Sequence, residues 1–421
     1  MTRVVITGIG IISPVGCGRN EFWTNLTSGL SGIGEITLFD ASSFPVRIGG
    51  EVKNFDAESV ISEFPESENI RDRKVFLALA AAKEALTDAH LTKSSLKQAL
   101  LHIGIGLEVF WLGDLTPYAH SSDVGQSLAT SLVSRMEDRL LQTPLDCTCN
   151  ILGDRYGFSA GKYTNCSACA AGAQVIGEAW QTLREGQAKI ALAGATDSML
   201  NPLGLGGFSL LRVLSDENDQ PQRACRPFDA SRKGTVLGEG AAFVVMETLD
   251  NALERQANIY AEIIGYGSSM DAFRVSDPDS TGRGAVQSMS KALEVAKLKP
   301  DDIDCVNAHG TGTIKNDIVE TAAIKEVFGK RAYSIPIHSV KSMTGHMIAA
   351  SGAVEAVTAS LTVSKKRIPP TINLTKPDDK CDLDYVPQRA RDFTGETVLS
   401  NSFGFGGQNA TLIFKRYTNG F

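Results

Sequence analysis

The sequence of 421 residues lacks several features that would define its class. It has no run of about 18 or more apolar residues, so we expect no membrane-spanning helix. Its eight cysteines are about 2% of the chain, far below the roughly 8–10% of disulfide-stabilised scaffolds, so we expect a reducing, cytoplasmic environment. It also lacks a basic excess, because 41 lysines and arginines face 48 acidic residues. The net charge of −7 argues against nucleic acid as a partner.

The N-terminal residues allow an alternative to a buried first strand, namely a secretion signal. Arg3 precedes an apolar stretch over residues 4–12, and Cys17 follows a glycine, which is the order of features in a signal peptide or a lipoprotein leader. Glycines interrupt the stretch, however, and Pro14 stands where a cleavage region should be small and flexible. A buried first strand that runs into a glycine turn explains these residues better.

Short β-branched runs alternate with amphipathic helical stretches along the chain. The pattern predicts buried strands at 4–6, 103–107, 190–193, 242–246, 259–264, 305–308, 398–401 and 410–414. It predicts helices at 74–89, 170–185, 284–296 and 318–328. Three irregular stretches, at 35–69, 113–154 and 214–234, are interpreted as surface excursions or inserted caps. This alternation indicates an α/β fold with a sheet covered on both faces.

Two pairs of segments resemble each other across the chain. The strand and glycines at 4–10 are similar to 259–267, and the glycine-flanked strand at 190–194 is similar to 398–407. The similarity suggests two related halves. We therefore expect an N-terminal half over residues 1–252 and a C-terminal half over residues 253–421.

Cys169 is the first candidate for chemistry. It stands directly before the predicted helix at 170–185, where the positive end of the helix dipole would favour the thiolate that attacks carbonyl carbon. Its neighbours Ala170, Ala171 and Gly172 are small enough to let a substrate approach, and their N–H groups could bind an oxyanion. The alternative is a buried structural cysteine in an alanine-rich helix.

Cys166 and Cys169 also form a Cys-x-x-Cys pair, with Cys147 and Cys149 upstream, so zinc and a redox dithiol are further alternatives. The upstream pair has one intervening residue where zinc ribbons have two to four. No thioredoxin-like context follows the second pair. We therefore expect no metal site.

Two of the six histidines stand in glycine-rich settings late in the chain. His309 follows the predicted strand at 305–308 and precedes Gly310 and Gly312, so it can point into a pocket that a substrate enters. His346 precedes an alanine-rich stretch, and Lys341 lies five residues before it. Together with Cys169 these residues suggest a nucleophile with two imidazoles and a cation.

A glycine-rich segment at 401–409 carries Phe403 and Phe405. Such a backbone can adopt unusual dihedral angles while it places one large apolar side chain, which suits a gate or an oxyanion-binding turn. The alternative is a plain glycine hairpin.

The four motifs at 165–172, 307–313, 340–346 and 401–409 resemble, in order and spacing, the active-site motifs of the β-ketoacyl-(acyl carrier protein) synthases of the type II elongating class. The resemblance continues almost from end to end, through 226–229 and 369–373. It implies the thiolase fold, a duplicated α/β/α/β/α five-layer core. It also implies an acyltransferase, a ketosynthase that extends a fatty acyl or polyketide chain by two carbons from malonyl-(acyl carrier protein).

The resemblance implies a role for each motif. Cys169 would accept the acyl chain, and His309 and His346 would be neutral donors that stabilise the enolate formed as carbon dioxide leaves. Lys341 would order His346. The N–H groups of Cys169 and Phe405 would form the oxyanion hole, with the Phe405 ring as a gate.

Supporting roles follow from the same resemblance. Glu320 would be the carboxylate partner of Lys341, and Thr311 and Thr313 would line the pantetheine and malonyl side. No bound cofactor is implied, because substrates arrive on the phosphopantetheine arm of an acyl carrier protein. Basic residues would dock that acidic protein: Arg73, Lys74 and Arg212. Their alternative interpretation is a solvated helix start.

Some segments depart from the family. Residues 147–162 differ from the usual run ahead of the cysteine motif, Glu108 to Trp111 replace a glycine-rich pocket wall, and 113–143 is hard to align. These departures favour a specialised type II polyketide pathway, with housekeeping fatty-acid elongation as the alternative. The expected assembly is a homodimer, or a heterodimer with a chain-length-factor-like subunit. A non-catalytic partner subunit is a further alternative, although Cys169, His309 and His346 are all present.

Overall fold

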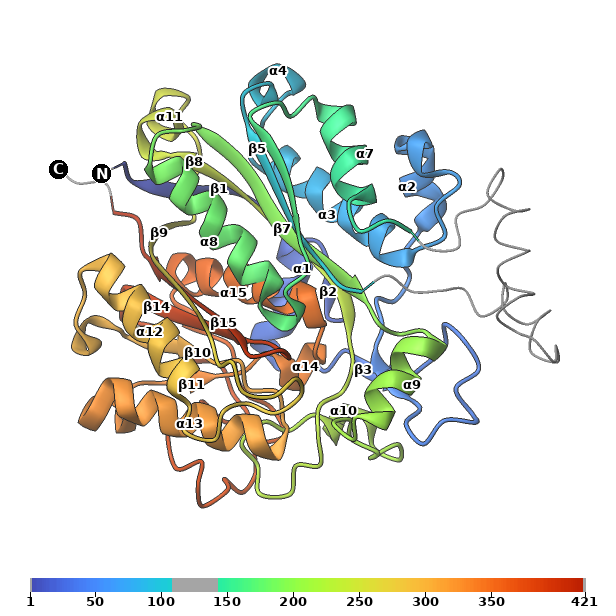
Figure 1. Cartoon of the computed structure of the whole chain (residues 1–421), viewed down its shortest axis with the longest axis vertical. Coiled ribbons are helices and arrows are strands. Elements are labelled where there is room, and N and C mark those ends of the chain that lie inside the picture. Colours follow the sequence, from blue (N-terminus) through green and yellow to red (C-terminus); the bar gives the residue numbers. More distant parts are fainter. Residues whose placement is uncertain (1, 108–142, 419–421) are drawn as a thin grey trace.

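The computed structural model describes residues 2–107 and 143–418 (Figure 1). The predicted pocket-wall residues Glu108 to Trp111 and nearly all of the segment 113–143 lie outside the described residues. No helix within the described ranges combines the length and the apolar character that a bilayer crossing requires.

The strands form two equivalent sets. The first set is β1 (Val4–Ser13), β5 (Leu100–Ile105), β6 (Gly161–Asn165), β7 (Ile190–Ser198) and β8 (Glu239–Thr248). The second set is β9 (Ala261–Met270), β10 (Cys305–Asn307), β11 (Ile337–His338), β14 (Thr397–Phe403) and β15 (Gln408–Lys415). Their order is β6-β5-β7-β8-β1 in one half and β9-β15-β14-β10-β11 in the other.

The two sets join edge to edge through β1 and β9, which pair antiparallel with Val4 opposite Ile263. From this junction outward, the same order of antiparallel and parallel strand pairs occurs in both halves. β8 matches β15, both antiparallel to the strands beside them, and the parallel pair β7 and β5 matches β14 and β10. The duplication suggested by the sequence is therefore present in the topology.

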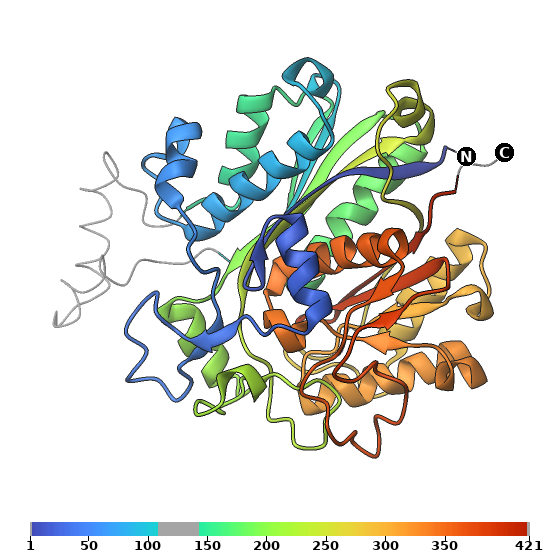
Figure 2. The ribbon, with the colours of Figure 1, turned by 180° about the vertical axis from the view of Figure 1, so that it is seen from behind.

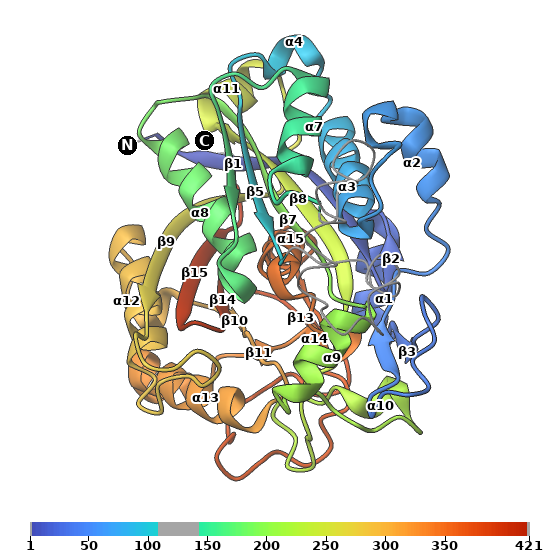
Figure 3. The same cartoon turned by 45° about the vertical axis from the view of Figure 1, so that its right-hand side comes forward.

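Helices complete five layers. Helices α8 (Ala171–Arg184) and α15 (Ser351–Lys365) lie between the two sheet halves (Figure 3). Helices α3 (Arg73–Asp88) and α7 (Cys147–Tyr156) cover the outer face of the first half, and α12 (Arg283–Ala296) and α13 (Ile314–Phe328) cover the second. Separate apolar clusters fill the centre and the two outer interfaces. The expected thiolase fold is confirmed.

The remaining elements are short. Helix α1 (Arg19–Ser28) packs against β1 and β2 (Gly16–Cys17), as the view from behind shows (Figure 2). The others are β3 (Ile33–Glu35), β4 (Ile48–Gly50), α2 (Ala57–Glu63), α4 (Lys93–Leu96), α9 (Pro202–Leu210), α10 (Pro221–Ala224), α11 (Leu249–Glu254), α14 (Lys341–Thr344), β12 (Arg367–Ile368) and β13 (Arg391–Asp392).

One sequence prediction about β1 is wrong. The strand does not end in a glycine turn but continues through its glycines to Ser13. A Cβ at Gly10 would lie 1.9 Å from the carbonyl oxygen of Ala81 in α3, and a Cβ at Gly267 of β9 would lie 2.1 Å from that of Ser288 in α12. These glycines therefore let each outer helix approach its strand closely, and the same device occurs in both halves.

Candidate active site

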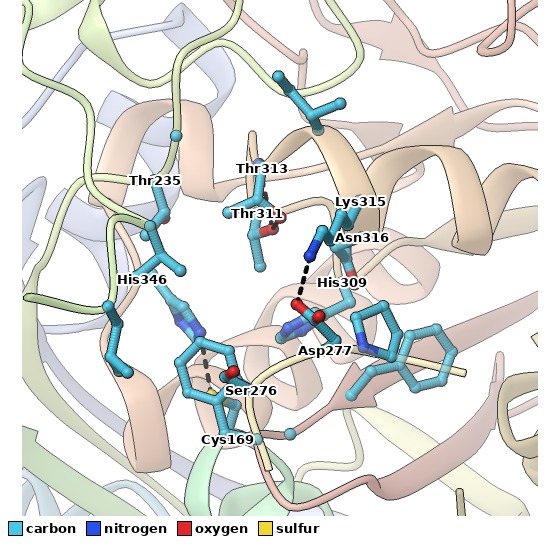
Figure 4. Close-up of a pocket in the computed structure, with 18 of the residues that line it drawn as sticks. Cys169, Thr235, Ser276, Asp277, His309, Thr311, Thr313, Lys315, Asn316 and His346 are labelled. Carbon is cyan, nitrogen blue, oxygen red and sulfur yellow. Dashed lines mark hydrogen bonds and ion pairs between the residues drawn. The ribbon is translucent and has the colours of Figure 1, made fainter. Parts of the chain in front are cut away.

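A cavity of about 300 Å³ lies where residues of the two halves meet (Figure 4). Its lining includes the predicted nucleophile, both predicted histidines, the two threonines and the glycine-rich turn: Cys169, His309, His346, Thr311, Thr313 and Phe405. Cys169 lies in a short helical turn before α8, His309 follows β10, and His346 lies between α14 and α15. Phe405 lies in the turn between β14 and β15. Strand ends and helix starts thus converge on one pocket.

Cys169 is held by an unusual backbone turn. The preceding residue, Ala168, has φ of 49°, a left-handed conformation that a non-glycine residue adopts at a cost of roughly 1–3 kcal/mol. The Cys169 side chain is buried, and its Sγ lies 3.1 Å from Nε2 of His346. This contact joins the two halves of the fold.

The thiol of Cys169 does not have the lowered pKa that its place before a helix predicts. Burial raises its pKa to about 12, while the backbone N–H groups of Phe405 and Cys169 and the nearby Lys341 oppose that rise. The resting group is therefore a thiol. The physical reason is that desolvation of the thiolate outweighs the favourable N–H groups and the nearby cation.

His346 is fixed by hydrogen bonds on both sides. Its Nδ1 lies 2.9 Å from Oγ of Ser351, which also accepts the backbone N–H of Met347 at 3.0 Å. Its own backbone N–H donates to the carbonyl of Val236. Since the Ser351 hydroxyl can accept from Nδ1 or donate to it, the neutral ring can carry its proton on either nitrogen.

His309 lies beside His346, with ring centroids 5.3 Å apart and planes at 83°. Lys341 donates to the backbone carbonyl of His309 at 2.7 Å and lies 3.4 Å from its Nδ1. An ammonium at Nδ1 leaves the ring proton of a neutral imidazole on Nε2. Burial, with Lys341 adding to it, lowers the pKa of both histidines well below the usual value. Both rings are therefore neutral near pH 7.

The carboxylate partner of Lys341 is Glu355 of α15, not Glu320 as the sequence predicted. Both groups of the pair are almost wholly buried. Burial raises the pKa of Glu355 to about 7, and Lys341 opposes that rise. Glu355 also accepts a hydrogen bond from the Ser402 hydroxyl at 3.2 Å, which links the Lys341 network to β14.

Glu320 has a different place. Its two carboxylate oxygens accept the backbone N–H groups of His309 and Gly310, each at 2.8 Å, and Oε1 also lies 3.3 Å from Nδ2 of Asn401. The carboxylate therefore holds the backbone of the turn that carries His309. The helix that supplies it, α13, begins four residues earlier than the predicted start at 318.

The two predicted threonines lie on the pocket wall with their hydroxyls 2.9 Å apart. Arg232 supports this wall from behind, because its buried guanidinium pairs with Asp317 at 3.2 Å and with Asp378 at 2.8 Å. Asp317 in turn accepts the backbone N–H of Gly312 at 3.2 Å. Phe405, which also lines the cavity, packs against Phe208 of α9 with ring centroids 6.2 Å apart.

The predicted docking residues differ in accessibility. Lys74 is buried and pairs with Asp72, so the prediction that it is a surface cation is wrong for this chain. Its ammonium also donates to the backbone carbonyl of Leu107 at 3.2 Å. Arg73 is partly exposed but pairs with the buried Glu239 at 2.9 Å. Arg212 is exposed and lines the cavity.

None of the eight cysteines is in a disulfide. Within residues 2–107 and 143–418, no group of three or more His, Cys, Asp or Glu side chains is arranged to hold a metal ion. Cys166 is exposed while Cys169 is buried, so the two thiols of the Cys-x-x-Cys pair differ in environment.

Two residues of the site, Glu355 and Ser351, were not predicted from the sequence. Glu355 is the one charged residue in the alanine-rich stretch from 348 to 363, and a lone carboxylate in such a stretch signals a buried partner. Asp197, at the inner end of β7, was also missed. It is fully buried, accepts the backbone N–H of Ala349 at 3.1 Å, and burial raises its pKa to about 7.

Comparisons with known proteins agree with this geometry. The β-ketoacyl synthase N-terminal domain matches residues 1–252, and the β-ketoacyl synthase C-terminal domain matches residues 260–375. The 3-oxoacyl-(acyl-carrier-protein) synthase 2 of Synechocystis sp. is 40% identical over 416 residues, which are 99% of this chain and 98% of the relative. A relative of the same name from Coxiella burnetii is 40% identical over 417 residues, which are 98% of each chain.

Solved structures are similar over the same length. The ishigamide ketosynthase/chain length factor is 33% identical with a TM-score of 0.87, covering 99% of this chain and 100% of that chain. A ketosynthase structure with a type II PKS acyl-carrier protein, bound to the hexaketide, is 31% identical with a TM-score of 0.84 and the same coverage. With the site described above, these matches show that the chain belongs to the β-ketoacyl synthase family of acyltransferases.

Proposed function

We propose that this chain catalyses a decarboxylative Claisen condensation. In this reaction an acyl group held on Cys169 is joined to a two-carbon unit from malonyl-(acyl carrier protein). One observation carries the proposal: Nε2 of His346 lies 3.1 Å from the buried thiol of Cys169, and the second neutral imidazole, His309, lines the same pocket. A nucleophile with two adjacent neutral imidazoles suits acyl transfer followed by enolate stabilisation.

Acylation comes first. The thiol proton of Cys169 passes to Nε2 of His346 as Sγ attacks the carbonyl carbon of an acyl thioester. The carbonyl oxygen becomes an oxyanion that the N–H groups of Cys169 and Phe405 can bind, since both oppose the rise in the pKa of the Cys169 thiol and so favour negative charge beside it. The intermediate then expels the carrier thiolate, which takes the proton back from His346. Acyl-Cys169 and a free carrier thiol remain.

Decarboxylation follows on the second substrate. The bond between the malonyl α-carbon and its carboxylate breaks, carbon dioxide leaves, and the electron pair forms an enolate whose charge lies on the thioester oxygen. Neutral His309 and His346 can each donate an Nε2 hydrogen to that oxygen. A cationic imidazole would instead protonate the enolate, so the lowered histidine pKa values serve the reaction.

Carbon–carbon bond formation completes the cycle. The enolate carbon attacks the acyl-Cys169 carbonyl, and collapse of the intermediate expels the Cys169 thiolate. The thiolate takes up one proton from solvent, so that each cycle consumes one proton overall. The product is a β-ketoacyl thioester on the carrier, longer by two carbons. Burial of both histidines and of Cys169 limits the access of water to the enolate.

The substrates would arrive on the phosphopantetheine arm of an acyl carrier protein, with no cofactor bound to this chain. Thr311 and Thr313 line the cavity where the arm would lie. Arg212 is the docking residue that the structure leaves accessible, and exposed apolar side chains flank it at Leu210 and Leu211. A cationic side chain beside apolar ones fits an acidic helical partner.

The domain division at residue 252, the dimeric assembly and a reducing cytoplasmic setting belong to the same proposal. The match of one family model to residues 1–252 supports the division. A homodimer, or a heterodimer with a chain-length-factor-like subunit, is supported by the similarity to a ketosynthase/chain length factor structure.

For the product, we propose a specialised type II polyketide pathway, which the similarity to two polyketide-type structures supports. The second candidate is housekeeping fatty-acid elongation, which the 40% identity to 3-oxoacyl-(acyl-carrier-protein) synthase 2 relatives favours. The two candidates differ in the acyl chain. A housekeeping enzyme should elongate saturated acyl groups best, and a polyketide enzyme should elongate poly-oxygenated or unsaturated ones best.

Mass spectrometry tests the proposal. Incubation with an acyl carrier-protein thioester should add one acyl group to Cys169, and addition of malonyl-(acyl carrier protein) should release carbon dioxide and the β-ketoacyl product. Cys166→Ala serves as the matched control and should acylate normally. Labelling of Cys166 alone would refute the proposal, and unchanged product from a Cys169→Ala chain in the reconstituted pathway would show a non-catalytic subunit instead.

A further inference from the structure

The mouth of the cavity is charged, unlike its inner end. Three cationic side chains line the cavity, those of Arg212, Lys233 and Lys315, together with the carboxylates of Asp271 and Asp277. Asp271 is buried, and its carboxylate oxygens accept from Asn409 at 2.7 Å and from the backbone N–H of Asp279 at 3.1 Å. These hydrogen bonds fix the Asp271 carboxylate. Of these two lining carboxylates, Asp277 is therefore the one that can exchange one cationic partner for another.

Lys315 and Asp277 form an ion pair across the mouth, with 2.6 Å between Nζ and Oδ1 (Figure 4). Lys315 is the second residue of α13, two residues after Thr313. Asp277 lies in the segment between β9 and α12. That segment is bonded to the turn that carries Phe405, because the N–H of Gly406 donates to the carbonyl of Val275 at 2.6 Å. The pair therefore joins two segments of the cavity lining that are far apart in sequence.

Lys315 can dissociate from this ion pair with little loss of free energy. The Lys315 side chain is 67% exposed, and an exposed pair of this kind contributes little to stability. Asp277 has a second cation, Arg274, at 3.6 Å, so its charge stays compensated when Lys315 moves away. Lys233, by contrast, has two carboxylates beside its ammonium, Glu217 at 2.5 Å and Asp216 at 4.0 Å.

We propose that Lys315 is the phosphate-binding residue of this pocket. In the structure its ammonium pairs with Asp277. When a phosphopantetheine arm places its thioester at Cys169, the ammonium moves to the phosphate of the arm and leaves Asp277 to Arg274. The proposal rests on the proposed function, because it assumes that phosphopantetheine thioesters enter this cavity.

Two small thioesters that differ only in the phosphate test this assignment: hexanoyl-pantetheine and hexanoyl-4′-phosphopantetheine. The measured quantity is kcat/KM for acylation of Cys169 at low ionic strength. Intact-protein mass spectrometry monitors the acylation. The wild-type chain should prefer the phosphorylated compound about fivefold, which corresponds to about 1 kcal/mol. Salt at about 0.5 M should reduce this preference.

Lys315→Met should bring the ratio of the two kcat/KM values to about one. Lys233→Met and the remote variant Lys291→Met should keep it, and Asp277→Asn should keep or increase it, because Lys315 is then free. A ratio of one in the wild-type chain, a ratio unchanged by Lys315→Met, or a ratio lost in Lys233→Met would each overturn the assignment. If neither thioester acylates Cys169, the proposed function fails instead.

Discussion

Lys341 donates to the backbone carbonyl of His309 at 2.7 Å and has Glu355 of α15 as its ion-pair partner. The pair lies at the centre of the molecule, where an unpaired charge would be costly. It places a compensated cation beside two imidazoles, and the positive charge helps to keep both rings neutral. Burial is the larger cause of the lowered pKa values, and this cation adds to it, so the histidines that the reaction uses are neutral.

The first prediction concerns this pair. Lys341→Met leaves the buried Glu355 carboxylate without its partner, so we expect the free energy of unfolding to fall by about 3–5 kcal/mol. The double variant Lys341→Met/Glu355→Leu should recover much of that loss, because neither charge remains. Urea denaturation measures the stability and release of labelled carbon dioxide measures decarboxylation. Decarboxylation should stay low in both variants, and normal decarboxylation in the double variant would contradict the role given to Lys341.

The second prediction separates the two histidines. His309→Ala should reduce malonyl decarboxylation by at least about 100-fold and affect acylation less, because the imidazole nitrogen beside Sγ belongs to His346. His346→Ala should reduce both steps, since Nε2 of His346 is the group next to the thiol. Single-turnover acylation and carbon dioxide release, measured on the same preparations, distinguish the steps. Equal effects of the two substitutions on acylation would show that the 3.1 Å contact is not used.

The third prediction concerns pH and His338 of β11. Within the described residues both ring nitrogens of this buried histidine lack a hydrogen-bond partner, and burial lowers its pKa to about 3. The unfolded chain takes up a proton below pH about 6.5 while the folded chain does not, so this residue makes stability fall as pH decreases from 7 to 5.5.

We expect His338 to lower the free energy of unfolding by about 1 kcal/mol between pH 7 and pH 5.5. Urea denaturation of the wild-type chain and of His338→Leu at pH 7 and pH 5.5 measures it. The loss of unfolding free energy between pH 7 and pH 5.5 should be smaller by about 1 kcal/mol in His338→Leu than in the wild-type chain. No shift would mean that His338 takes up its proton in the folded state.

The fourth prediction contrasts two basic residues from the sequence analysis. Arg212→Glu reverses an exposed charge at the cavity mouth, so KM for a carrier-protein substrate should rise about tenfold with little change in melting temperature. Lys74→Met removes a buried cation beside Asp72, so it should lower the melting temperature. Steady-state kinetics and calorimetry on both variants check the contrast. A Lys74→Met chain with normal stability and weakened carrier binding would reverse this assignment.

Much of the fold could be predicted because it depends on local pattern. Apolar β-branched runs gave the main strands, and helical spacing gave α3, α8, α12 and α13. The glycines of β1 were misinterpreted as a turn, since a glycine in a strand and a glycine in a turn look alike until the helix that packs on it is known. Gly10 lies against Ala81, 71 residues away, and that contact is tertiary.

The sequence by itself determined the four motifs and therefore which side chains meet, because their strands and helix starts end at one place in this fold. Only the tertiary structure decided their electrostatics. Glu355, rather than Glu320, pairs with Lys341, Lys74 is buried, and the thiol of Cys169 has a raised pKa. The physical reason is that charge pairing and desolvation depend on distance and burial in space. The spacing of residues along the chain determines neither the distances between them in space nor their burial.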